Sequence, residues 1–477
     1  MANAWEWHPD EMRGAGSILD ARYRVVPFVG RDAERSDLTN WCRTGDGLIR
    51  LYHAAGGIGK TRLLMQVCQD LKETHRWLAG FIDEKYNKND AWTARAFDEL
   101  VAQDGAKLLV VDYADTKTGA AAGIISAAHG RNNRETPLKI VLLAREGPRE
   151  EDHGGADVPW IAAIKRESAG AQHLVAGMQA FHLEPLADTL EARQRMFRAA
   201  RTAFAKTKKI EANGAWPEPD LSPPADQTKD DPFKRTLFVH AAALASLEGK
   251  RIESADDLLR DMREREERSW TAGLQAFELG GVATVDLFID IAAIITLSGG
   301  LDKRKEALAL IEKLPSAPQG QRAKLQQVVR LLAQLYPGDR FVDPVRPDLL
   351  GEHIVQQALT ADDDLLDIAL EPPANPAMAL AVLRRLAERR HAIAQPWLER
   401  TAFELAKRFD TDTGGLILQI IDELPKQTSA FWPVCPRRSA KGTLASKLIA
   451  PSASTITVFT PPKPAVGRRR LRRAPRR

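Results

Sequence analysis

Short apolar runs alternate with amphipathic stretches over residues 25–185. Four of these runs are rich in Leu, Ile and Val and have the length of strands: residues 48–52, 78–82, 108–111 and 139–143. Strands that are covered on both faces have continuous apolar sequences, and helices between them are typical of parallel sheets. The pattern therefore predicts an α/β region, with a parallel sheet that carries helices on both faces.

After about residue 185 the strand pattern ends, and apolar residues recur at helical spacing. A loop rich in Pro and Asp over residues 212–231, and a turn between short strands at residues 336–345, interrupt the helices. One helix opens at Pro347, and residues 375–409 suggest a helical hairpin broken near Pro396. The second half of the chain is therefore predicted to be all-α, with further helices at residues 190–208, 236–247, 254–270, 281–297, 303–313 and 320–335.

Cysteine usage and hydropathy exclude several classes of protein. Three cysteines, at positions 42, 68 and 435, are not spaced as zinc ligands or as a disulfide framework. The N-terminus lacks the basic and apolar segments of a signal peptide. The longest apolar stretch, residues 282–297, contains Asp286 and Asp290 on one helix face, which indicates a core helix with one solvated side. We therefore expect a cytoplasmic protein without a membrane span.

Positive charge is concentrated at the C-terminal end. The formal net charge is +4, and residues 468–477 contain seven arginines, so the rest of the chain is slightly acidic and not a basic nucleic-acid binder by composition. The Pro- and Arg-rich residues 429–477 are expected to be a disordered basic tail. This tail is a solvated segment without a partner, a weak, salt-dependent binder of nucleic acid or anionic lipid, or a truncated sensor region with an altered reading frame.

Residues 53–63 match a phosphate-binding loop between a predicted strand and a predicted helix. Glycine allows the loop's N–H groups to turn toward an oxyanion, Lys60 can reach the β- and γ-phosphates of ATP, and Thr61 can bind Mg²⁺. Ala54 replaces the first glycine of the usual pattern, which is the smallest change available. The predicted nucleotide-binding residues here are Gly56, Gly57, Ile58, Gly59, Lys60, Thr61 and Arg62.

The acid that completes a magnesium site is expected at the end of another buried strand. Asp112 follows the apolar run 107–111 and is the best candidate to hold Mg²⁺ with Thr61, through the metal's water shell. Many P-loop ATPases have a carboxylate directly after this aspartate to activate water, but here Tyr113 follows and the nearest acid is Asp115. We therefore expect slow hydrolysis, unless the loop turns Asp115 inward as the base.

Two arginines are candidates for contacts with the nucleotide. Arg145 follows the apolar run 139–143 and is expected at the carboxyl edge of the sheet, where it can sense or stabilise the γ-phosphate charge. Gly30 and Arg31 lie upstream of the phosphate loop. Backbone groups there are expected to contact adenine, and Arg31 to cap the ribose or the phosphates.

With these motifs the chain resembles STAND-class signalling ATPases, which are AAA+-like bacterial relatives of nucleotide-binding immune receptors. The resemblance covers residues 25–360 and rests on residues 27–31, 56–62, 109–115 and 142–145, and more faintly on 237–244 and 345–353. It implies three domains: a P-loop nucleotide-binding domain (25–185), a small helical domain (186–272) and a winged-helix-like domain (273–360). A flexible segment (1–24) is expected before them, and a short helical region (361–428), a candidate for a truncated sensor, after them.

The same resemblance implies an ADP-bound resting state that opens on exchange for ATP and assembles into a homo-oligomer, in bacterial defence or in regulation. Two features of the family pattern are missing. The helical-domain proline near adenine has no counterpart at residues 235–238, and Arg346 or Pro347 falls near the place of the histidine that touches the β-phosphate. His240 and His353 are alternatives for that histidine, although a lone helical histidine is more often a packing residue.

Three other functions are open at this point. An AAA+-like motor or remodelling ATPase, of the clamp- or helicase-loader type, would act on protein or nucleic acid, but it needs a catalytic acid beside Asp112, where Tyr113 stands. A non-catalytic scaffold would not need the intact Lys60, Thr61 and Asp112. Kinase or transferase activity would need an acceptor-substrate motif, and we find none.

Overall fold

The computed structural model describes most of the chain up to residue 408. The described residues are 13–44, 46–82, 91–129, 136–148, 158–167, 169–210, 216–224, 231–281, 283–371 and 376–408. They all belong to one compact unit. The basic tail at residues 429–477 lies outside the described residues, so what we expect of it stays a prediction.

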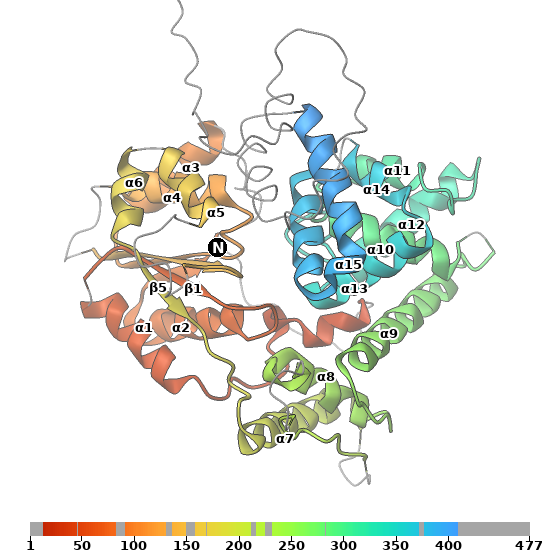
Figure 1. Cartoon of the computed structure of the whole chain (residues 1–477), viewed down its shortest axis with the longest axis horizontal. Coiled ribbons are helices and arrows are strands. Elements are labelled where there is room, and N and C mark those ends of the chain that lie inside the picture. The colour runs from red at the N-terminus through yellow and green to blue at the C-terminus, as the bar shows by residue number, and fades with distance from the viewer. Residues whose placement is uncertain are drawn as a thin grey trace, which may run out of the picture. The chain divides into compact units, whose positions relative to one another are not determined.

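A five-stranded parallel sheet forms the centre of the first half of the chain (Figure 1). Its order is β2-β3-β4-β1-β5. The four strands predicted from apolar runs are confirmed within one or two residues at each end. The fifth is not among the predicted strands, because β5 is an edge strand with mostly exposed side chains and no apolar run. The strands are β1 (Ile49–His53), β2 (Leu78–Phe81), β3 (Lys107–Val111), β4 (Leu138–Ala144) and β5 (Gln179–His182).

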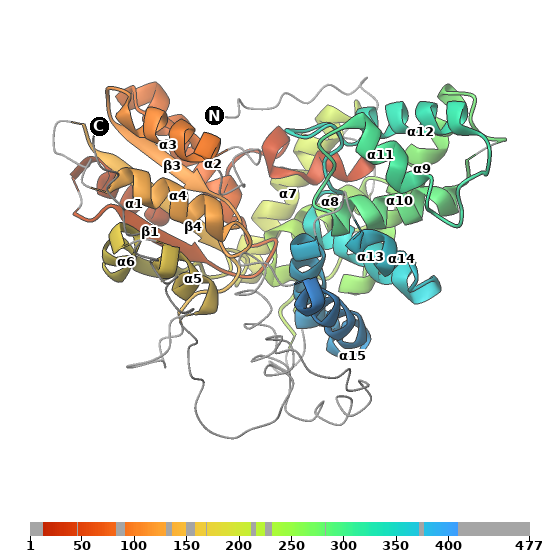
Figure 2. The same cartoon turned by 90° about the horizontal axis from the view of Figure 1, so that it is seen from above.

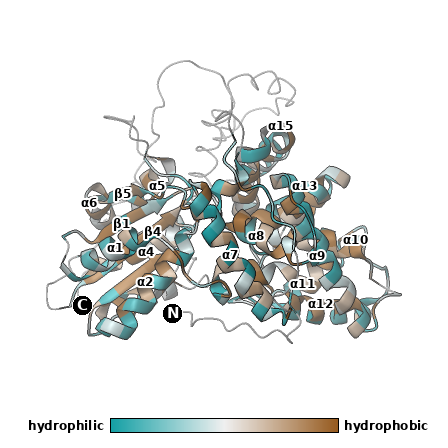
Figure 3. Ribbon diagram, turned by 90° about the horizontal axis from the view of Figure 1, so that it is seen from below, coloured by the Kyte–Doolittle hydropathy of each residue, from teal (hydrophilic) through white to brown (hydrophobic). Residues whose placement is uncertain are grey.

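Helices cover both faces of this sheet, as the sequence predicts. On one face α1 (Asp32–Thr44) and α2 (Lys60–His75) pack against alternate strand residues. On the other face lie α3 (Ala91–Ala102), α4 (Thr118–Ala128), α5 (Pro159–Glu167) and α6 (Ala169–Ala176). Strand β4 is coloured mostly hydrophobic in Figure 3, since its apolar side chains enter one core or the other.

After the sheet, the described residues form helices. Helix α8 contacts α7 and α9, while α10 contacts α13 and α15, which lie side by side (Figures 1 and 2). None of the described helices is long and apolar enough to cross a membrane. The helices are α7 (Leu190–Thr207), α8 (Thr236–Ser246), α9 (Ala255–Ala276), α10 (Val285–Leu297), α11 (Arg304–Ile311), α12 (Arg322–Leu335), α13 (Asp348–Ala361), α14 (Leu365–Leu370) and α15 (Pro376–Arg408).

Residues 13–24, expected to be flexible, are instead folded against the helices. Two short 3-10 helices, η1 (Ala15–Leu19) and η2 (Ala21–Tyr23), form this segment. The N–H of Gly14 donates to the carbonyl of Leu335 at 2.8 Å, and the N–H of Gly16 donates to the buried Glu266 carboxylate at 3.1 Å. The segment is too short to fold alone, but α9 and α12 supply the partners that it needs.

Two further expectations differ from the structure. The predicted short strands at residues 336–345 reduce, within the described residues, to one antiparallel bridge between Leu301 and Val342. The break in the last helix lies at Arg390, where φ is −137° and ψ is 50°, and not near Pro396. An interior proline removes one hydrogen bond of a helix, but here the chain bends six residues earlier.

Candidate nucleotide-binding site

The predicted phosphate loop lies between β1 and α2, at the carboxyl end of the sheet. The central strand β1 pairs with β4 on one side and with β5 on the other, so the chain leaves it where a parallel sheet binds its ligand. Gly57 and Gly59 have φ of +82° and +104°, a region that favours glycine, and Gly59 directly precedes α2. The loop therefore has the strand–loop–helix context that phosphate binding requires.

Ala54, the departure from the usual loop pattern, is accommodated without strain. Its side chain is buried in the core beneath the loop, and its backbone is not in the left-handed region where glycine is needed. Its carbonyl accepts a hydrogen bond from Lys60 Nζ at 2.6 Å, and the Ala55 carbonyl accepts a second at 3.2 Å. The substitution thus leaves the shape of the loop intact.

Lys60 is surrounded by charges of both signs. Burial, and to a smaller extent the nearby Arg145 guanidinium, lower the pKa of its ammonium to about 8, although Asp112, Asp115 and Asp348 act in the opposite direction. A buried cation without enough compensating negative charge favours the binding of an anion. The electrostatics of Lys60 therefore fit a polyphosphate group.

Thr61 and Asp112 come together as the sequence predicts for a magnesium site. The Thr61 hydroxyl donates to Asp112 Oδ2 at 2.9 Å, and the N–H of Tyr113 donates to Oδ1 at 3.0 Å. Burial raises the pKa of the Asp112 carboxyl, against the opposing influence of Lys117, Thr61 and Lys60. A hydroxyl and a carboxylate beside a phosphate loop are the hard oxygen ligands that Mg²⁺ prefers, so these residues fit the metal.

Asp115 and Tyr113 take different places after β3. Asp115 Oδ2 accepts the N–H of Arg145 at 2.9 Å, which ties the loop after β3 to the end of β4. Tyr113 has a φ of +60°, and its phenol donates to the carboxylate of Asp348. The position directly after Asp112 is therefore occupied by a side chain that contacts the helical region and has no carboxylate.

Arg145 lies at the carboxyl edge of the sheet, where the sequence places it, and it also contacts α13. Its Nη2 donates to Glu352 at 2.9 Å and lies 3.4 Å from Asp348. A Cβ built on Gly56 would lie 3.1 Å from the Arg145 guanidinium carbon, so the arginine also touches the phosphate loop. The two carboxylates on α13 are residues that the sequence analysis does not identify.

Arg31 is buried beside the phosphate loop and supports it through hydrogen bonds. Its side chain is 4% exposed, and it donates to the carbonyls of Ile58 at 3.4 Å and Glu184 at 2.6 Å and to the Glu34 carboxylate at 2.6 Å. Gly30 turns the chain before it with a φ of +78°. These contacts give Arg31 a role in positioning the loop, and its contact with a ribose or a phosphate stays a prediction.

The start of α8 closes over the same loop. The N–H of Leu237 donates to the Gly57 carbonyl at 3.1 Å, and Arg235 Nη1 donates to the Gly56 carbonyl at 3.1 Å. Arg235 therefore contacts the loop from residues 235–238, the stretch in which the sequence has no proline.

A cavity of about 560 Å³ joins these elements. Phosphate-loop residues, Asp112 and Arg145 line one part of it. Phe28, Leu186 and Met196 give another part apolar walls, as a flat base requires. The Arg62 guanidinium lies 5.4 Å over the Phe28 ring within this wall. Size and chemistry together fit a nucleotide.

The two histidines considered from the sequence lie in different environments. His240 lines the cavity, and burial, together with the Arg62 charge, lowers its pKa to about 4. His353 is not among the residues that line the cavity, and its pKa is also lowered to about 4, by burial and then by Arg263. Of these two histidines, His240 is therefore the one that a nucleotide in the cavity could reach.

One spacing signal could have revealed the α13 residues. Asp348 and Glu352 are four residues apart on α13, and Arg385 and Arg389 have the same spacing on α15. Residues four apart share a helix face, so the two pairs suggest complementary charged faces. The sequence does not say which helices meet, and this contact needs the structure.

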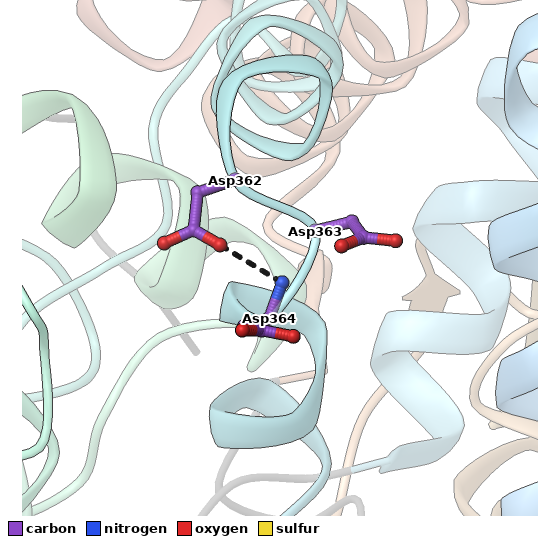
Figure 4. A group of neighbouring side chains, drawn as sticks. All are labelled: Asp362, Asp363 and Asp364. Atoms are coloured by element: carbon purple, nitrogen blue, oxygen red, sulfur yellow. Dashed lines mark hydrogen bonds between the residues drawn. The ribbon is translucent and has the colours of Figure 1, made fainter.

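A second group of possible metal ligands within the described residues lies at the start of α14 (Figure 4). Asp362, Asp363 and Asp364 are close together, but the Asp362 carboxylate accepts the N–H of Asp364 at 3.1 Å. Asp363 pairs with Arg400 at the surface. Aspartates at a helix start commonly bond to nearby backbone in this way, and we assign no site to them.

Comparison with known proteins adds little. No protein-family model and no curated protein match the chain. Among solved structures, the Orc1 protein of Aeropyrum pernix in complex with DNA is 13% identical, with a TM-score of 0.32 over 71% of this chain and 94% of that one. Cdc6p from Pyrobaculum aerophilum is 12% identical, with a TM-score of 0.31 over 80% of this chain and 98% of that one. A Walker-type ATPase of Pyrococcus abyssi is 12% identical, with a TM-score of 0.30 over 71% of this chain and 99% of that one.

Likenesses this weak carry no argument about function. The assignment rests on the chain's own geometry: the strand order, the loop between β1 and α2, and the bond between Thr61 and Asp112. The chain has the fold and the nucleotide-site geometry of a P-loop NTPase.

Proposed function

We propose that this chain is an ATP- and ADP-binding switch of the STAND type, in which the nucleotide controls how the helical region contacts the phosphate loop. The observation that carries this proposal is a shared cavity: residues of α8 and α13 line the same space as the phosphate loop and Asp112. A ligand in that space touches both parts of the chain. Whether ADP or ATP is bound can therefore change the contact between the phosphate loop and the helices α8 and α13.

Each side chain has a distinct role in this proposal. Lys60 and the loop N–H groups hold the phosphates, and Thr61 and Asp112 hold Mg²⁺. Bound Mg²⁺ supplies positive charge that neutralises the phosphates. Arg31 keeps the loop in shape through Ile58, and Arg145 faces the phosphate end of the cavity. The position of these residues around one cavity supports these roles.

The environment of Asp112 supports slow hydrolysis. Tyr113 follows Asp112 and donates to Asp348, so no carboxylate stands there to take a proton from water. Slow turnover suits a switch, because the ATP-bound state must persist long enough to act. We further propose that this state exposes surfaces that α8 and α13 now cover, and that it assembles into a homo-oligomer.

One observation favours the alternative, an AAA+-like motor or remodelling ATPase. Asp115 Oδ1 is buried and has no hydrogen-bond partner within the described residues, while Oδ2 is held by the N–H of Arg145. A carboxylate oxygen in that state is a candidate base. Fast turnover that is lost in Asp115→Asn would favour this second function.

Mass and bound nucleotide, measured on the purified protein in ADP and in ATP with Mg²⁺, test the proposal. We expect a monomer that carries ADP and assembles in ATP, and we expect Lys60→Ala and Asp112→Ala to lose this assembly. Lys305→Ala, an exposed lysine on α11, is the matched control and should behave as the wild type. Unchanged mass with rapid ATP turnover would overturn the switch, and absence of any nucleotide binding would indicate a scaffold.

A further inference from the structure

Glu352 on α13 is a fully buried carboxylate that three arginines share. Arg145 Nη2 lies 2.9 Å from Oε1, Arg385 Nε lies 3.1 Å from the same oxygen, and Arg389 Nη2 lies 2.8 Å from Oε2. The exposure of the Glu352 side chain is 0%. A buried charge is tolerated only with partners of this kind, because burial alone is costly. The arrangement therefore fixes all three guanidinium groups.

The three arginines come from two different parts of the chain. Arg145 directly follows β4, beside the phosphate loop, whereas Arg385 and Arg389 lie one turn apart on α15. Burial raises the pKa of Glu352, but the three cations outweigh it, so the net pKa is lowered and the carboxylate stays charged. A single ionised group thus connects the nucleotide cavity with the last described helix.

Arg145 stands between the carboxylates of α13 and the phosphate loop. On one side are Glu352 and, at 3.4 Å, Asp348; on the other Gly56 of the loop lies against the guanidinium. Arginine keeps its charge in proteins, so it cannot respond to its surroundings by losing a proton. It can respond only by changing partners, and a terminal phosphate at the loop is an alternative partner that also repels the two carboxylates.

We propose that Glu352 is a positioning residue for the nucleotide site, which holds Arg145 on α13 and thereby makes ADP bind better than ATP. Arg385 and Arg389 determine how strongly Glu352 binds Arg145, because they share the negative charge of the Glu352 carboxylate. α15 is therefore the element through which the rest of the chain influences the choice of nucleotide. This inference rests on the proposed function, since it requires that the cavity binds both nucleotides.

The ratio of dissociation constants for ADP and ATP, each measured with Mg²⁺ by displacement of a fluorescent ADP analogue, tests the inference. Glu352→Gln removes the charge that competes with a terminal phosphate, and we expect the preference for ADP to fall about tenfold. Arg389→Gln leaves Glu352 with one cation fewer, so its hold on Arg145 strengthens and the preference for ADP should rise about threefold. Opposite shifts from two neighbouring substitutions are not expected from damage to the fold.

Glu371→Gln is the matched control. Glu371 directly follows α14 and is an exposed partner of Lys313, so the ratio of the ADP and ATP dissociation constants should not change in this variant. If Glu352→Gln does not fold, Asp348→Asn provides the same sign of shift from a side chain that is 18% exposed. Equal weakening of ADP and ATP binding in Glu352→Gln, or shifts of the same sign in both variants, would overturn the role of Glu352. A wild-type protein that binds neither nucleotide would instead refute the proposed function.

Discussion

The contact between the start of α8 and the phosphate loop can be tested at Gly57. This residue has a φ of +82°, and a Cβ built on it would lie 3.1 Å from Cβ of Leu237 and 3.4 Å from Cδ1 of Leu349. The Leu237 Cβ cannot rotate away, because it is fixed to the helix backbone. Gly57→Ala must therefore move α8 relative to the loop or distort the loop.

Gly47 provides a matched comparison with the same backbone conformation. Its φ is +81°, and a Cβ built on it would meet nothing within 4 Å. Placing alanine in this left-handed region costs about 1–2 kcal/mol, which the smaller freedom of the unfolded chain offsets by roughly 0.4–1 kcal/mol. We therefore expect Gly47→Ala to lower the free energy of unfolding by about 1 kcal/mol. Overpacking adds about 1–3 kcal/mol at Gly57, so Gly57→Ala should cost roughly 2 kcal/mol more.

Urea unfolding followed by circular dichroism, together with ADP titration, separates the two variants. Gly47→Ala should bind ADP as the wild type does. Gly57→Ala should bind it at least tenfold more weakly, because the loop and α8 form one wall of the cavity. The double variant Gly57→Ala with Leu237→Gly removes the clash and should recover part of the loss, as a double-mutant cycle measures. Equal unfolding free energies and equal ADP affinities for the two alanine variants would refute the contact.

Two buried charged groups give further predictions. Burial raises the pKa of Glu266 to about 7 in the folded state and so penalises the charged form. The contribution of this group to stability is therefore fully present below pH 4.5 and is lost as the pH rises through 7. Glu266→Gln should gain roughly 3 kcal/mol relative to the wild type across that range, and a pH-independent difference in urea unfolding would contradict this. Arg193 is fully buried and pairs with Asp231, so Arg193→Met should cost about 3–5 kcal/mol in thermal or urea unfolding. The double variant Arg193→Met with Asp231→Leu should recover most of it, and no recovery would mean that packing, not charge, sets the cost.

The sheet and its loop were accessible from the sequence because their signals are local. β1, β3 and β4 are buried along almost their whole length, since each face of the sheet carries helices, and few elements besides a central parallel strand have such short, continuous apolar runs. The phosphate loop and Asp112 follow two of these strands directly. Their approach, with Thr61 2.9 Å from Asp112, follows from the parallel arrangement, which brings the carboxyl ends of strands to one edge.

The parts that escaped prediction depend on contacts between distant segments. Residues 13–24 have no strong pattern of their own, and their fold depends on acceptors such as the Leu335 carbonyl and Glu266, far along the chain. Strand β5 is held by pairing with β1 while its side chains stay mostly exposed. The meeting of Arg145 with Glu352 joins residues 207 positions apart. Periodicity within a window says nothing about such pairs.

Three departures from the patterns of STAND-class and other P-loop ATPases bear on the charge of one cavity. Residues 235–238 contain no proline, and Arg235 donates from there to the Gly56 carbonyl, while the segment without the expected histidine places Arg346 and Asp348 on the cavity wall. Tyr113 replaces a carboxylate and bonds to Asp348. An apolar contact responds to the shape of the base, whereas charged groups near the phosphates respond to the number of negative charges on the ligand. If the site distinguishes ADP from ATP, these residues make the distinction mainly electrostatic. The balance of charge between Arg145 and the carboxylates of α13 then determines which nucleotide is preferred.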